Sequence, residues 1–160
     1  MEGNKVQPRA ILVFGAPGSG KSTFADKFSK KFHAAFFDLG EIERENELDR
    51  DTTLFLLEQL AHTKVTLVIE GVLDTERERT EIRNVLRRAG YNPSLVWIQT
   101  DVSTIRQRLK LKNRSAAKAK QEYNSRIQNM EAPSEIESPI VLSGKHTFET
   151  QLRHVLTQLA

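Results

Sequence analysis

The residues best suited to chemistry form one short glycine-rich stretch, GAPGSGKS, from Gly15 to Ser22. Its glycines permit backbone conformations that a Cβ would block, so that successive N–H groups can point into one concavity and hold an anion. Lys21 can reach the β- and γ-phosphates of a nucleotide, and the Ser22 hydroxyl can ligate Mg²⁺. The residues that we expect to bind a nucleotide here are Gly15, Ala16, Pro17, Gly18, Ser19, Gly20, Lys21, Ser22 and Thr23.

The segments around this stretch have the order that a phosphate-binding loop requires, which is strand, loop and helix. The apolar run Arg9 to Phe14 predicts a buried strand, and phenylalanines then recur every four residues, as on one face of a helix. Further apolar runs at 34–37, 65–69, 95–98 and 139–142 predict four more strands, with helical patterns between them. Such alternation predicts an α/β fold with three αβα layers, in which helices cover both faces of a five-stranded, mostly parallel sheet.

Length and composition limit the kind of protein. A chain of 160 residues fits one domain, 1–160, with room for a substantial core. The chain has no cysteine, which excludes disulfides, zinc–thiolate sites and a thiol nucleophile. No apolar run approaches the length of a membrane span, and the net charge of +3 is too small to imply nucleic-acid binding. We therefore expect a soluble cytoplasmic protein, monomeric or homodimeric.

A basic segment, about 106–120, contains seven lysines and arginines and no acidic residue. Apolar periodicity is lost in its middle, which favours a mobile cationic lid. A solvated helix face is the alternative, because charge runs are commonly no more than that.

The motif GAPGSGKST after ILVF resembles the P-loop NTPases, in the AAA_33-like branch of small-molecule and polynucleotide kinases. Four other features occur in that branch's order: an acid after the second strand, an acid after the third, a basic lid, and RIQNMEAP at 126–133. RIQNMEAP is similar to gluconate kinases, while VIEGVLDTERER and RAGYNPSLVWIQTD are similar to polynucleotide kinases and zeta toxins. The resemblance implies the P-loop kinase fold, with ATP and Mg²⁺ as cofactors.

Asp38 is our candidate catalytic base, because it ends the second strand at the sheet edge where open parallel sheets bind ligands. Glu41 is its rival, since FFDLGEIERE can be aligned with the family in either register. The resemblance also assigns Arg44 to substrate. The alternatives are that Asp38 caps a helix and that Arg44 forms a surface ion pair.

The resemblance implies that Glu70 holds a Mg²⁺-bound water beside Ser22, although many relatives have aspartate there. Asp74 is a second choice, but we expect it to begin the next helix. In the lid, Arg114 is the expected catalytic and nucleotide-binding arginine, and Arg108 or Lys110 is its counterpart on the preceding helix. Arg126 is expected to face the substrate.

These assignments predict an ATP-dependent phosphotransferase that moves the γ-phosphate of Mg-ATP to a hydroxyl of a small metabolite, nucleoside or sugar, or of a polynucleotide 5′ end. A nucleotide-gated regulatory module is the alternative. A nucleoside monophosphate kinase is disfavoured because residues 39–52 are short and acidic. The same acidity disfavours a nucleic-acid partner, unless Arg44 and Arg50 dominate locally, whereas the basic lid favours one.

Overall fold

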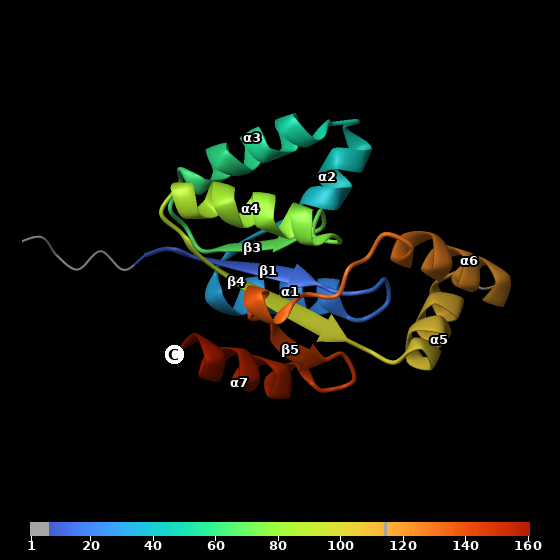
Figure 1. Cartoon of the computed structure of the whole chain (residues 1–160). Coiled ribbons are helices and arrows are strands. Elements are labelled where there is room, and N and C mark those ends of the chain that lie inside the picture. The colour runs from blue at the N-terminus through green and yellow to red at the C-terminus, as the bar shows by residue number, and fades with distance from the viewer. Residues whose placement is uncertain (1–6, 114) are drawn as a thin grey trace, which may run out of the picture.

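The computed structural model describes residues 7–113 and 115–160, and its centre is one parallel sheet (Figure 1). Its strand order is β2-β3-β1-β4-β5, and every pairing between neighbouring strands is parallel. The strands are β1 (Arg9–Phe14), β2 (Ala35–Asp38), β3 (Leu67–Glu70), β4 (Asn92–Gln99) and β5 (Ile140–Ser143). Parallel pairing makes the carboxyl ends of all five strands meet at one edge.

Helices cover both faces of this sheet, which confirms the predicted three layers. On one face are α2 (Leu39–Glu45), α3 (Arg50–Ala61) and α4 (Glu76–Arg88). On the other are α1 (Lys21–Phe32) and α7 (Phe148–Leu159) (Figure 1). Strand β1 is buried on both faces: Leu12 and Phe14 belong to the core under α3 and α4, and Ile11 and Val13 to the core under α1 and α7.

The basic segment forms two helices, α5 (Val102–Asn113) and α6 (Ala116–Ile127), which stand beyond the carboxyl ends of the strands (Figure 1). The segment predicted to form a lid is therefore largely helical over its described residues. Ile105, Leu109, Ala119 and Tyr123 from the two helices share a small core of their own. A return segment, residues 128–139, leads from α6 back to β5 and contains the 3₁₀ turn η1 (Glu135–Glu137).

Most element boundaries differ from the sequence expectation by only one or two residues. Strand β3 begins at Leu67 and not at Val65, because Lys64 has a positive φ of 58° and Val65 is exposed. Asp74 does not begin α4, contrary to our expectation: Thr75 caps this helix, and its hydroxyl accepts a hydrogen bond from the Glu78 amide. No helix in the described ranges is long and apolar enough to cross a membrane.

Candidate phosphoryl-transfer site

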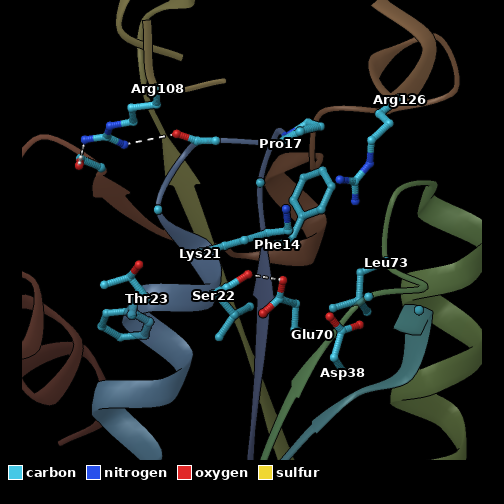
Figure 2. A pocket seen from close by; sticks show the side chains of 18 of the residues that line it. Phe14, Pro17, Lys21, Ser22, Thr23, Asp38, Glu70, Leu73, Arg108 and Arg126 are labelled. Carbon is cyan, nitrogen blue, oxygen red and sulfur yellow. Dashed lines mark hydrogen bonds between the residues drawn. The ribbon is translucent and has the colours of Figure 1, made fainter. Parts of the chain in front are cut away.

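One large cavity, of about 880 Å³, opens at the carboxyl ends of the strands. Its walls come from the glycine loop, from the turns that follow β2, β3 and β5, and from helices α5 and α6. Figure 2 shows this cavity with Lys21 and Ser22 at its floor, and with Asp38 and Arg126 on the side away from Arg108. The fold thus brings most of the candidate residues to one place.

Carbonyl groups of the glycine loop accept hydrogen bonds from within the loop and from the strand end nearby. The carbonyl of Ala16 accepts the Ser19 amide at 3.0 Å, and the carbonyl of Ser19 accepts the Thr100 hydroxyl at 2.9 Å. Helix α1 begins directly after Gly20, whose φ of 100° suits glycine, and no side chain of the described residues caps this end. An uncapped helix N-terminus with its amides facing a cavity favours phosphate binding.

Seven of the nine predicted loop residues line the cavity: Gly15, Pro17, Gly18, Gly20, Lys21, Ser22 and Thr23. Ala16 and Ser19 do not line it. Ala16 instead packs against the small core shared by α5 and α6, and Ser19 is fully buried. These two residues shape the loop from behind.

Ser22 and Glu70 form the best candidate for a metal site. The Ser22 hydroxyl donates a hydrogen bond to Glu70 Oε1 at 2.6 Å, as Figure 2 shows. The other carboxylate oxygen of Glu70, Oε2, is buried and has no hydrogen-bond partner within the described residues. Burial raises the pKa of Glu70, while the bond from Ser22 and the charge of Lys21 oppose that rise. A hydroxyl beside a carboxylate with a spare buried oxygen fits Mg²⁺, which prefers oxygen ligands and bound water.

Lys21 lies deep in the same cavity. Its burial lowers the pKa of its ammonium group, and the charge of Glu70 only partly counteracts that shift. Because nearby carboxylates only partly offset the cost of burying the Lys21 ammonium group, this lysine is suited to bind an anionic ligand such as a phosphate group.

The cavity is lined by all four residues that the sequence assigned to substrate, namely Asp38, Glu41, Arg44 and Arg126. Asp38 pairs with Glu70 across β2 and β3, so that two carboxylates end neighbouring strands side by side. Asp38 Oδ1 also accepts the Glu41 amide at 2.9 Å and caps α2. The two roles proposed for Asp38 are therefore compatible, because the cap occupies one of its two oxygens.

Arg44 matches both descriptions that the sequence left open. It lines the cavity, but its side chain is 65% exposed and its Nε lies 3.8 Å from Glu45. Arg50 does not line the cavity: it bonds to Glu78 at 2.5 Å and so ties α3 to α4. Its Nη1 also lies 4.0 Å from Glu43 Oε2, so Arg50 partly offsets the acidity of α2 from outside the cavity.

Among the lid residues, Arg108 lies over the glycine loop. It donates to the carbonyl of Gly18 at 3.0 Å and to that of Gly144 at 2.9 Å, and so joins the loop to the turn after β5 (Figure 2). Lys112 lines the cavity and Lys110 does not. Arg114, the predicted lid arginine, lies outside the described residues.

A family model described as "AAA domain" matches residues 11–135. The chain belongs to this AAA domain family. No curated protein sequence matches this AAA domain.

The solved structures that resemble this AAA domain include three kinases. A sugar kinase from a Janibacter species has 23% identity and a TM-score of 0.65, and the match covers 95% of this chain and 94% of that one. A gluconokinase from Sinorhizobium meliloti has 15% identity and a TM-score of 0.71, and the match covers 96% of this chain and 92% of that one. The APS kinase from Mycobacterium tuberculosis, solved with AMPPNP and APS, has 17% identity and a TM-score of 0.71. The match covers 96% of this chain and 98% of that one. The AAA domain thus has the P-loop kinase fold.

Several residues that line the cavity had been given no role, or only a secondary one, from the sequence. Asp74 lines it, and burial together with the charge of Glu78 raises the pKa of its carboxyl. The turn after β5 supplies another wall through Gly144, His146, Thr147, Phe148 and Gln151. The signal for that wall was available, because the turn follows the carboxyl end of a parallel strand.

Proposed function

We propose that this chain is an ATP-dependent phosphotransferase that moves the γ-phosphate of Mg-ATP to a hydroxyl of a small molecule. The observation that carries the proposal is that Asp38 and Glu70 are in register at adjacent strand ends, in one cavity with Lys21. The first carboxylate is placed for the acceptor and the second for the metal. Both carboxylates line the same cavity as the glycine loop, whose backbone amides can bind phosphates.

In this reaction the residues mainly bind and orient. The loop amides and Lys21 hold the β- and γ-phosphates, while Ser22 and Glu70 would hold Mg²⁺. When bound, Mg²⁺ neutralises charge on these phosphates. Asp38 accepts the proton of the acceptor hydroxyl while that oxygen forms a bond to the γ-phosphorus, and the bond from phosphorus to the ADP oxygen breaks.

A small, polyhydroxylated acceptor suits this cavity better than a polynucleotide. We define the acceptor side of the cavity as five of its lining residues, three carboxylates and two arginines: Asp38, Glu41, Asp74, Arg44 and Arg126. Carboxylates accept hydrogen bonds from hydroxyls, whereas a row of backbone phosphates would be repelled by them. The sugar kinase and gluconokinase among the similar structures support the same acceptor class.

The direct test is a screen of metabolites and oligonucleotides for transfer of label from γ-labelled ATP, with Mg-AMPPNP binding measured by calorimetry. We expect AMPPNP to bind, at least one small hydroxyl compound to be phosphorylated, and Lys21→Ala to abolish transfer. Tight AMPPNP binding without any acceptor would instead favour a nucleotide-gated regulatory module. Phosphorylation of oligonucleotides alone would overturn the small-molecule assignment.

A further inference from the structure

Arg79, on α4, is a fully buried arginine outside the residues that line the cavity. Its guanidinium forms a fork with Glu137, in which Nε and Nη2 donate to the two carboxylate oxygens at 2.7 and 3.1 Å. The remaining nitrogen, Nη1, donates to three backbone carbonyls at 3.0 to 3.1 Å, those of Leu73, Asp74 and Glu131. All three nitrogens of this side chain are thus in use.

These carbonyls belong to two segments that are distant in the sequence. Leu73 and Asp74 belong to the turn after β3 that lines the cavity, and Glu131 lies near the start of the return segment that leads from α6. The two segments also bond directly, because the Glu131 amide donates to the Asp74 carbonyl at 2.8 Å. Arg79 therefore lies where the turn after β3 meets the return segment at the base of the lid.

The same guanidinium also contacts Phe14, the residue just before the glycine loop. It lies over the ring of Phe14, 4.8 Å from the ring centre, and Phe14 lines the cavity. The ring of Trp97 stacks against Phe14, with a centroid separation of 6.3 Å. Arg79 thus contacts the last residue of β1, the turn after β3 and the return segment.

Stability alone does not account for this arrangement, because a buried ion pair is often no more stabilising than apolar residues of the same volume. What the guanidinium adds is geometry, since its planar fork fixes several acceptors relative to one another. Asp74 is the functional group most directly affected. Its carboxyl lies close enough to Lys21 and Arg126 for their charges to act on it.

We propose that Arg79, held by Glu137, is a positioning residue that fixes Asp74 and the base of the lid, and that Asp74 binds a hydroxyl of the acceptor. The acceptor role of Asp74 rests on the proposed function. The anchoring by Arg79 does not, so the two parts are tested separately.

The anchoring is tested by amide hydrogen exchange at Glu131, comparing Arg79→Lys with Arg83→Lys. Arg83 is a matched control: it is one helical turn away and donates to the Glu137 carbonyl at 2.8 Å, but within the described residues it makes no hydrogen bond to Leu73 or Asp74. Lysine keeps the charge at either position and loses the fork. We expect exchange of the Glu131 amide to accelerate by at least about tenfold in Arg79→Lys and by less than about threefold in Arg83→Lys.

Thermal unfolding of both variants shows whether they remain folded under the exchange conditions. If Arg79→Lys does not fold, Glu137→Gln takes its place, because it loosens the fork from the opposite side. Unchanged exchange in the folded variant, or equal acceleration in the Arg83→Lys control, would overturn the anchoring. This measurement needs neither nucleotide nor acceptor, so its result stands even if the phosphorylation screen fails.

The positioning of Asp74 is tested with the acceptor that the screen identifies. Arg79→Lys and Asp74→Asn should both raise the acceptor KM by about tenfold or more, because small displacements of a binding group are costly. The dissociation constant of Mg-AMPPNP should change by less than about threefold. Equal weakening of AMPPNP and acceptor would show general loosening and reject the positioning role. A normal acceptor KM in Asp74→Asn would reject the role of Asp74.

Discussion

At the scale of single residues, Lys21 and Glu70 line the cavity, and desolvation disfavours the charged form of each. Burial lowers the pKa of Lys21 and raises the pKa of Glu70, and their mutual attraction opposes both shifts. An anionic phosphate beside Lys21 and a cation beside Glu70 would each stabilise the charged form. The cost of burying these two groups therefore favours a ligand that brings both charges together, as Mg-ATP does.

Replacement of Glu70 by glutamine tests the metal assignment. Glutamine has almost the same shape and keeps an oxygen for the Ser22 bond, but it lacks the negative charge that favours Mg²⁺. We expect phosphoryl transfer to fall by about a hundredfold, with a higher magnesium concentration needed for half-maximal rate. Rates measured over a magnesium titration check this, with Glu70→Asp as the charged control. A wild-type magnesium response in Glu70→Gln would exclude Glu70 as the metal ligand.

Two variants of Asp38 separate its structural role from its chemical role. Asn is as good a helix cap as Asp, so Asp38→Asn should preserve stability and lose most of the acceptor-dependent transfer. Asp38→Ala should lose transfer and about 1 kcal/mol of stability as well, because the Glu41 amide loses its partner.

Urea unfolding and steady-state kinetics measure the two effects. Glu41→Gln is the control for the rival base. If Asp38→Asn turned over normally and Glu41→Gln did not, the base would be Glu41.

At the scale of elements, the acceptor side depends on close packing between the turn after β3 and the start of α2. Gly71 has a φ of 81°, and a Cβ at this position would collide with the backbone of Gly40 and lie 2.7 Å from Asp38 Oδ1. The backbone of this turn therefore approaches α2 more closely than any side chain would allow. That approach brings the turn after β3 close to the carboxylate of Asp38.

Gly71→Ala should destabilise the fold and displace Asp38. Backbone strain alone costs about 1–3 kcal/mol, and the collision adds to it. Gly90→Ala provides the control, because Gly90 has a similar φ of 83° but only Lys64 Nζ, at 3.8 Å, near the added Cβ. Unfolding free energies from urea titrations should show a larger loss at Gly71. Equal losses at both positions would mean that the close approach to α2 is unimportant.

The sequence predicted those elements whose signals are local. The buried strand, the glycine loop and the helix after it are contiguous, so composition and spacing were sufficient to identify them. The second lid helix was not predicted separately, because Ala119 and Tyr123 pack in one small core with Ile105 and Leu109 of the first.

Long-range contacts explain what the sequence missed within the site. The partners Arg79 and Glu137 are separated by 58 residues. Arg79 is the last residue of VIEGVLDTERER, but nothing in that stretch indicates its partner. Asp74 was noticed, but its place in the cavity follows from how the turn after β3 packs and not from its neighbours in the sequence. The family resemblance did identify Asp38, Glu70 and Arg126, all of which line the cavity.

At the scale of the whole molecule, the pair of Arg79 and Glu137 links α4 to the return segment and so connects the lid to the central layers. Burial would raise the pKa of Glu137, but hydrogen bonds from Arg79 and the Ser134 amide, with the charges of Arg79 and Arg83, lower it overall. A carboxyl whose pKa is lowered by folding stabilises the fold most when it is ionised.

The contribution of Glu137 should therefore be complete above pH 4.5, its ordinary pKa, and should disappear as the pH falls through the lower folded value. At about pH 7, Glu137→Gln should cost roughly 3 kcal/mol, because Arg79 loses its charged partner. At about pH 3 the difference from wild type should shrink markedly. Urea titrations at both pH values provide the comparison. A difference that stays constant with pH would mean that this carboxyl contributes no ionisation-linked stability.

The stacked pair of Phe14 and Trp97 has a practical consequence. The chain contains one tryptophan, so all of its indole emission originates behind the phosphate-binding loop. Phe14 lines the cavity, and a nucleotide that settles there will alter the surroundings of its stacking partner. Intrinsic fluorescence should therefore follow nucleotide binding in real time, without a dye or an engineered label.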